Sequence, residues 1–157
     1  MQYKDVFFAE HNFSIFPNGE LYWQDKKTLI ISDLHFEKGS FFSDSSQFIP
    51  PFDTIETLSQ LTKFIDHHPV ETIIFLGDLI HDTLALQRMA KESKELFLEL
   101  VKTINCTLTV GNHDHRDFLR DIGVVATDVS KEPEDHIAFV CEIMRCTMDI
   151  HSTRARR

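Results

Sequence analysis

Apolar runs that end in polar residues recur along most of the chain, and their lengths predict alternating strands and helices. Three short runs, Thr28–Ser32, Glu71–Asp78 and Cys106–Asp114, begin with apolar or β-branched residues that few polar residues interrupt. Such runs are typical of strands buried on both faces of a sheet. Earlier in the chain, FSIF and LYW flank Pro17–Gly19, which is the pattern of a hairpin.

The segments between these strands have helical spacing. A helix is expected to begin at Asp53, an N-cap residue that forms a capping-box pattern with Glu56, and to end before Pro69. Its apolar residues recur at spacings of three and four, which predicts one buried face; they are Ile55, Leu58, Leu61 and Ile65.

A second helix is expected over Thr83–Lys102 and a short third one over Arg116–Gly123, whereas Gly39–Phe52 is interpreted as a loop. The residues expected to point inward from the second helix are Leu86, Met89, Ala90, Phe97 and Val101. Strands that alternate with helices predict an α/β fold. Open α/β sheets place their ligand sites at the carboxyl ends of the strands.

Composition narrows the class of protein. The 157 residues fit one domain, 1–157. The net charge of -9 argues against broad, non-specific binding of nucleic acid. It does not exclude a nuclease, because metal ions supply positive charge locally. Cys106, Cys141 and Cys146 form no CxxC pair, which indicates reduced thiols rather than sulfur ligands. With no signal-peptide pattern and no membrane-spanning run, we expect a cytoplasmic protein without a membrane partner.

Three polar motifs follow the three buried strands. They are SDLH at Ser32–His35, GDLIHD at Gly77–Asp82 and GNHDH at Gly111–His115. A lone DxH is common by chance, whereas GNHD is more specific. The order of all three motifs, each after an apolar strand, favours a functional site over three unrelated turns.

The residue types in these motifs predict a centre of two divalent metal ions. Asp33 and His35 would bind one cation, Asp78 would bridge both, and Asn112 would offer its carbonyl oxygen to the second. Mixed oxygen and nitrogen ligands suit Mn²⁺, Fe or Zn²⁺ better than Ca²⁺. Two such ions about 3.5–4 Å apart clamp a phosphoryl group and activate a hydroxide as nucleophile.

Neighbouring residues are candidates for catalysis and substrate binding. His113 is placed to donate a proton to the leaving oxygen, and Asp114 to orient its imidazole. Lys38 is a candidate phosphate contact, against the alternative of a solvated lysine, and His81 has either a substrate role or a structural one. The pair His67-His68 is interpreted as a helix end.

At this point the sequence resembles a known family. Asp33-x-His35, Gly77-Asp78 and Gly111–Asp114 resemble the first three signature blocks of the calcineurin-like metallophosphoesterases. The strings DLHFEKG and FLGDLIHD are similar to a bacterial subgroup, the DNA-ligase-associated metallophosphoesterases, which are assigned as DNA-repair endonucleases. The resemblance covers residues 10–125.

The resemblance implies a four-layer α/β/β/α sandwich and assigns roles to the motif residues. Asp33, His35 and Asp78 would hold the first metal and Asp78 and Asn112 the second, with Mn²⁺ as the expected ion and His113 assisting catalysis. It also implies DNA or nucleotides as substrates and DNA ligase or helicase as repair partners. A phosphomonoesterase or nucleotidase with the same metals is the alternative enzyme.

The C-terminal part departs from the family pattern. A strand-end histidine and a GHxH motif are expected to complete the metal shells, and neither is present. His136 and His151 lie in contexts unlike a metal-binding turn, and residues 126–157 form an atypical tail. We interpret the fold as incomplete at this end, with a shifted reading frame near Met148–Arg157 or a naturally short C-terminus as hypotheses. This predicts a poor catalyst, and a catalytically silent partner-binding protein is a further alternative.

Overall fold

The structure is a computed structural model that describes residues 2–8, 10–32, 34–43, 53–110, 114 and 116–127. The chain divides into two compact units, Met1–Ala126 and Thr127–Arg157. All the elements below belong to the first unit, apart from the last residue of the final strand. The tail at 126–157 therefore falls almost entirely outside the described residues. The described strands form one sheet, and the second sheet that the resemblance implies stays a prediction.

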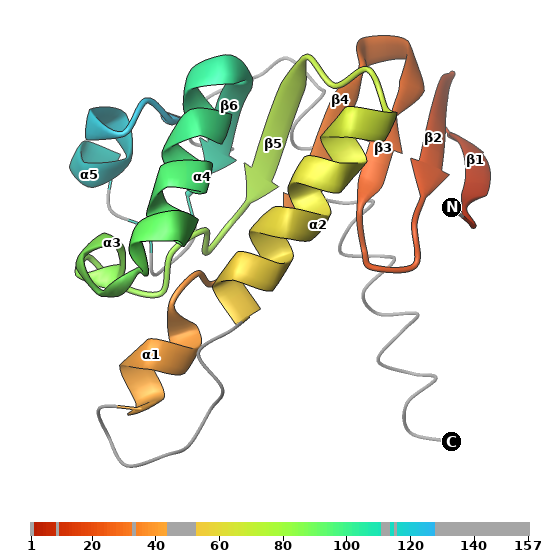
Figure 1. Ribbon diagram of the computed structural model, residues 1–157. Helices are drawn as coiled ribbons and strands as arrows, with labels where there is room; N and C mark the ends of the chain where they lie inside the picture. The colour runs from red at the N-terminus through yellow and green to blue at the C-terminus, as the bar shows by residue number, and fades with distance from the viewer. Residues whose placement is uncertain are drawn as a thin grey trace, which may run out of the picture. The chain divides into compact units, whose positions relative to one another are not determined.

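A seven-stranded sheet forms the centre of the first unit, with its strands in the order of the sequence (Figure 1). Strands β1 to β4 pair antiparallel with one another in sequence order, and β4, β5 and β6 pair in parallel. The strands are β1 (Lys4–Phe8), β2 (His11–Ile15), β3 (Leu21–Trp23), β4 (Thr28–Ser32), β5 (Thr72–Leu76), β6 (Asn105–Thr109) and β7 (Val125–Thr127). The α/β class predicted from the sequence is confirmed.

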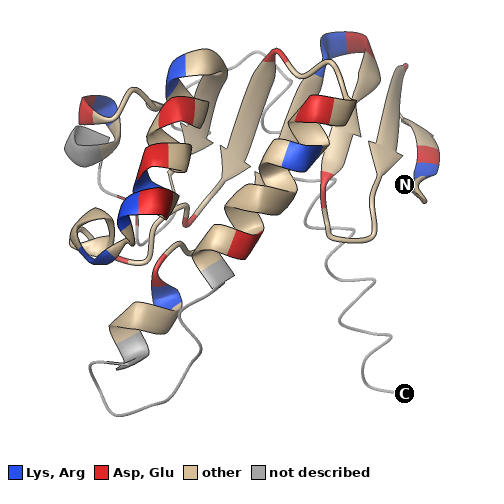
Figure 2. Ribbon diagram, in the orientation of Figure 1, with Lys and Arg blue, Asp and Glu red and all other residues tan. Residues whose placement is uncertain are grey.

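Among the described residues, five α-helices connect or follow the strands: α1 (Lys38–Ser43), α2 (Asp53–His67), α3 (Ala85–Arg88), α4 (Lys91–Thr103) and α5 (Arg116–Asp121). The long helices α2 and α4 lie side by side over one face of the sheet, where each forms the crossover between two parallel strands (Figure 1). Acidic and basic residues are interspersed along both helices (Figure 2). No helix in the described part of the chain is long and apolar enough to cross a membrane.

The core lies between the sheet and these two helices. Leu29, Ile30 and Ile73 on β4 and β5 are fully buried, as predicted for strands covered on both faces, whereas in β6 only Cys106 and Leu108 are buried and Asn105 is exposed. Leu58, Leu61 and Phe64 on α2 belong to the same buried cluster as Leu29, Ile73 and Leu108, and α4 contributes Phe97 and Val101 to it.

The hairpin before the parallel strands was also predicted correctly. Its turn closes through a hydrogen bond from the Phe16 amide to the Glu20 carbonyl, at 2.9 Å, and one from Gly19 to the Phe16 carbonyl, at 3.1 Å. Gly19 has a φ of 96°, which L residues rarely adopt. The neighbouring edge strand β1 was not predicted, because its residues are exposed and show no apolar period.

Two predictions were wrong. The expected loop Gly39–Phe52 begins with α1, and the expected helix Thr83–Lys102 is two helices, α3 and α4. Met89 and Ala90 separate them with extended ψ angles of 131° and 145°. The break leaves Met89 buried but turns Ala90 to solvent, so Ala90 does not point inward as expected.

Candidate active site

The segments that follow β4 and β5 run side by side. The His35 amide donates a hydrogen bond to the Asp78 carbonyl at 2.8 Å, and the Phe36 amide donates one to the Leu79 carbonyl at 3.0 Å. The His81 amide then returns one to the Phe36 carbonyl at 3.1 Å. The parallel pairing of the two strands thus continues beyond their ends, and it fixes the first two motifs against each other.

Both segments contain left-handed backbone. His35, Glu37 and Asp78 have φ values of 46°, 65° and 41°, and Gly77 has 71°. Non-glycine residues rarely adopt this region, and such residues cluster at functional sites. The Gly77 amide donates to the Thr109 carbonyl of β6 at 2.8 Å, so the turn after β5 is also tied to the third parallel strand.

These turns bring two predicted metal ligands together. The His35 Nε2 atom lies 3.8 Å from the Asp78 Oδ2 atom, and the two side chains are 20% and 13% exposed. Asp33, Asn112 and His113 lie outside the described residues, so their placement is not part of this geometry.

The His35–Asp78 pair fits part of a divalent-metal site. An imidazole nitrogen and a carboxylate oxygen are donors that first-row divalent ions accept, and the two atoms lie 3.8 Å apart. Within the described ranges, no group of three or more His, Cys, Asp or Glu side chains gathers to hold an ion. The remaining predicted ligands, Asp33 and Asn112, are outside those ranges, so the full ligand set stays a prediction.

Asp114 anchors the second motif from a distance. Its Oδ1 atom accepts hydrogen bonds from the amides of Leu79, at 3.0 Å, and Ile80, at 3.4 Å. The carboxylate is buried, and so are the two residues whose amides it accepts. Its expected role on the His113 imidazole stays a prediction. The sequence reasoning missed this anchoring role, because no local pattern signals a contact over 35 positions.

His81 lies beside the pair. Its ring centroid is 5.9 Å from that of His35 and 4.6 Å from that of Phe41 on α1, and the side chain is buried. Lys38 begins α1 and is exposed, with its amide donating to the His35 carbonyl at 3.0 Å. Both residues therefore lie near His35, and their substrate roles stay predictions.

A set of contacts around Arg88 that the sequence reasoning missed joins α3 to α1. The Arg88 guanidinium binds both carboxylate oxygens of Asp82, donates to the Ser40 hydroxyl at 3.2 Å, and lies 5.8 Å from the centre of the Phe41 ring. The hydrogen bonds from Arg88 lower the pKa of Asp82 below its ordinary value. The network thus links α3 to α1, whose Phe41 ring contacts the His81 ring.

The fold and these strand-end motifs define a class of metal-dependent phosphoester hydrolases. A model of the calcineurin-like phosphoesterase family matches residues 26–142, and the chain belongs to this family. This match confirms the resemblance stated above at the level of the family.

A comparison of structures supports the same fold. The crystal structure of Pseudomonas putida nuclease MPE is similar with a TM-score of 0.68 at 21% sequence identity. The match covers 85% of this chain and 63% of that nuclease, so the chain spans less than two thirds of its length. A comparison with curated proteins gave no match.

Proposed function

We propose that this chain is a metal-dependent phosphodiesterase that acts on nucleic acid or nucleotides. The observation that carries the proposal is the His35–Asp78 pair, held at 3.8 Å by the paired segments after β4 and β5. Membership of the calcineurin-like phosphoesterase family supports the hydrolysis of phosphoesters. The fold shared with a nuclease favours a diester substrate.

Four side chains would hold the metals: Asp33 and His35 at one ion, Asn112 at the other, and Asp78 between them. When bound, two divalent ions supply positive charge to the phosphoryl group and lower the pKa of a water. His113 would donate a proton to the leaving oxygen. Asp114 keeps the turn after Asp78 in place by accepting the Leu79 and Ile80 amides.

The finer parts of the proposal concern the metal and the biological setting. We propose Mn²⁺ as the ion, because the ligands combine carboxylate oxygen, amide oxygen and imidazole nitrogen. We also propose that the chain acts in DNA repair in the cytoplasm, with a DNA ligase or helicase as partner. The support is the resemblance of the DLHFEKG and FLGDLIHD strings to the ligase-associated subgroup.

The test is hydrolysis of a chromogenic phosphodiester by the purified chain, with Mn²⁺ or with a chelator. Because the C-terminal ligand motifs are absent, we expect slow Mn²⁺-dependent turnover. Asp78→Asn should lower it by roughly 100-fold or more, because even a group that only orients a metal ligand is worth about 10–100-fold. His113→Ala should also lose turnover. His67→Ala is the matched control, since His67 is exposed at the end of α2 and its ring bonds the Lys63 carbonyl of the same helix.

Two outcomes would redirect the proposal. Faster turnover of a chromogenic monoester than of the diester would favour the phosphomonoesterase or nucleotidase alternative. No turnover by a chain whose circular dichroism and cooperative unfolding show that it is folded would favour the catalytically silent, partner-binding alternative.

A further inference from the structure

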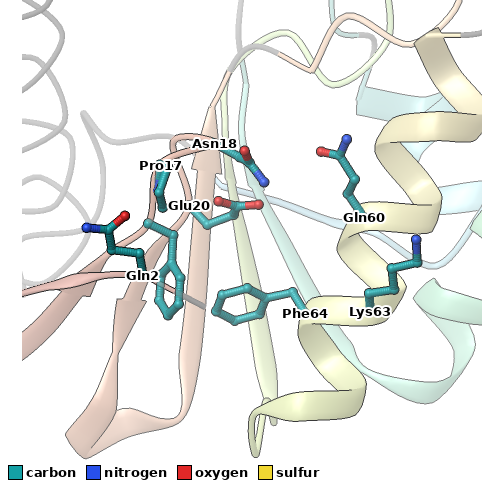
Figure 3. A pocket seen from close by; sticks show the side chains of 8 residues that line it. Gln2, Pro17, Asn18, Glu20, Gln60, Lys63 and Phe64 are labelled. Atoms are coloured by element: carbon teal, nitrogen blue, oxygen red, sulfur yellow. The ribbon is translucent and has the colours of Figure 1, made fainter.

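A groove runs between the β2–β3 turn and α2. It consists of two adjoining hollows of about 190 and 240 Å³, and Asn18, Glu20 and Gln60 line both. Figure 3 shows the first hollow, with Asn18 and Glu20 on the side of the turn and Gln60 and Lys63 on the side of α2. Nothing in the roles assigned above uses these residues.

Glu20 is the unusual residue in this groove. Its side chain is only 8% exposed, and its Oε2 atom is buried without a hydrogen-bond partner among the described residues. Its backbone is fixed, because its carbonyl accepts the Phe16 amide across the turn. A buried carboxylate oxygen without a donor is costly, so a donor supplied by a ligand would compensate for the cost of burial.

The remaining lining defines the shape and chemistry of that ligand. Phe16 and Phe64 form an apolar floor in the first hollow, and Ile31 and Leu61 do so in the second. Asn18 and Gln60 each carry an amide that donates and accepts, although the Gln60 Nε2 atom also reaches Glu56 at 3.4 Å. A lining that combines apolar side chains with amides that both donate and accept hydrogen bonds suits a flat heterocycle.

The size limits the occupant to one ring system. Each hollow is smaller than the roughly 300–1,000 Å³ of pockets for drug-sized ligands. Lys63 on the first hollow is exposed, and its ammonium is the only cationic side chain among the residues that line the two hollows. A base in the groove with a phosphate near Lys63 would match both the carboxylate and the ammonium.

The groove also reaches the first of the three motifs, SDLH at Ser32–His35. Leu34 lines the second hollow, and it stands in the sequence between the predicted metal ligands Asp33 and His35. A nucleic-acid strand with one phosphate at the metal site would therefore have a neighbouring base within reach of the groove.

We propose that this groove binds one unpaired base of the substrate, and that Glu20 accepts a hydrogen bond from the exocyclic amino group of that base. This inference rests on the proposed function and names the part of the substrate that the site recognises. Cytosine offers such an amino group to carboxylates, as it does in DNA complexes. Thymine is disfavoured, because two carbonyl oxygens flank its single ring N–H and would face the carboxylate.

The test compares binding of two mononucleotides, dCMP and dTMP, by calorimetry in the presence of a chelator. The two ligands carry the same phosphate, so their difference reports the base alone. We expect dCMP to bind on the order of tenfold more tightly, the effect of one hydrogen bond to a charged group. Glu20→Met, which keeps the length of the side chain and removes both acceptors, should abolish this preference.

Two further variants complete the design. Glu20→Gln keeps one acceptor without the charge and should retain part of the preference. Glu99→Gln, an exposed carboxylate on α4, is the matched control and should bind like the unaltered chain. Replacing a buried carboxylate whose Oε2 atom has no hydrogen-bond partner among the described residues should not unfold the chain, and a thermal melt checks this.

Equal binding of dCMP and dTMP, binding of neither, or a preference that survives Glu20→Met would overturn the inference. The readout is separate from catalysis. A chain that distinguishes the two nucleotides but hydrolyses no phosphodiester would retain the base site and lose the proposed function. A chain that hydrolyses the phosphodiester but binds dCMP and dTMP equally would retain the proposed function and lose the base site.

Discussion

The parallel and antiparallel halves of the sheet differ in burial. In the parallel half, β4 and β5 are covered on both faces, and each continues into a segment that carries a motif. In the antiparallel half, edge strand β1 is exposed, with Phe7 70% and Phe8 46% accessible. Because β3 in the antiparallel half is buried along its length, the difference teaches that the strands before the predicted metal ligands lie in the packed part of the sheet, whereas the outer edge at β1 adds little packing.

The largest effect on stability is expected in the parallel half, at Ile73 of β5. This side chain is fully buried, so Ile73→Ala should lower the free energy of unfolding by about 2–5 kcal/mol. Urea titration followed by the fluorescence of Trp23, the single and buried tryptophan, measures the change. Ile73→Val is the graded control, with an expected loss of about 0.5–1.5 kcal/mol. If Ile73→Ala lowers the free energy of unfolding by less than Ile73→Val does, the expected importance of packing around the parallel strands is contradicted.

An intermediate effect is expected at Asp114, which tests whether the turn after β5 depends on its distant anchor. Asp114→Ala leaves the buried amides of Leu79 and Ile80 without this acceptor, which should cost about 1–3 kcal/mol. Asp114→Asn keeps an acceptor and should cost less. The same urea titration measures both variants, and equal losses would show that the hydrogen bonds to Oδ1 do not matter.

The smallest effect is expected at the edge of the antiparallel half. Phe7→Ala removes a ring that is mostly in solvent, so the free energy of unfolding should change by no more than about 0.5 kcal/mol. Phe13→Ala on β2, where the ring is 1% exposed, is the matched comparison and should cost several times more. A large loss at Phe7 would place this edge among the regions that stabilise the fold.

The sequence predicted the elements whose apolar pattern is local. Buried strands β4, β5 and β6, helix α2 and the β2–β3 hairpin follow from runs, spacing and turn residues. It failed where partners distant in sequence decide the structure. The break at Met89 and Ala90 is one case, because Arg88 donates to Ser40, which lies 48 positions earlier, and Met89 turns to the core.

For the site, the sequence correctly placed His35 and Asp78 at the same edge, because parallel strands end together. It did not find Asp114 as an anchor for the Leu79 and Ile80 amides, or Arg88 as the link between α1 and α3. The local sequence around a carboxylate that follows a strand does not show which backbone amides that carboxylate will bind.

The hydrogen bonds that join the segments after β4 and β5 have a consequence for how the molecule forms. His35 and Asp78 meet only when two strands separated by all of α2 have paired, so no short peptide that contains either motif carries this geometry. Closing so long a loop costs chain entropy before any contact compensates for it, and folds with such contacts form slowly. Recovery of the His35–Asp78 geometry after dilution from urea should therefore follow β4–β5 pairing rather than the faster formation of α2.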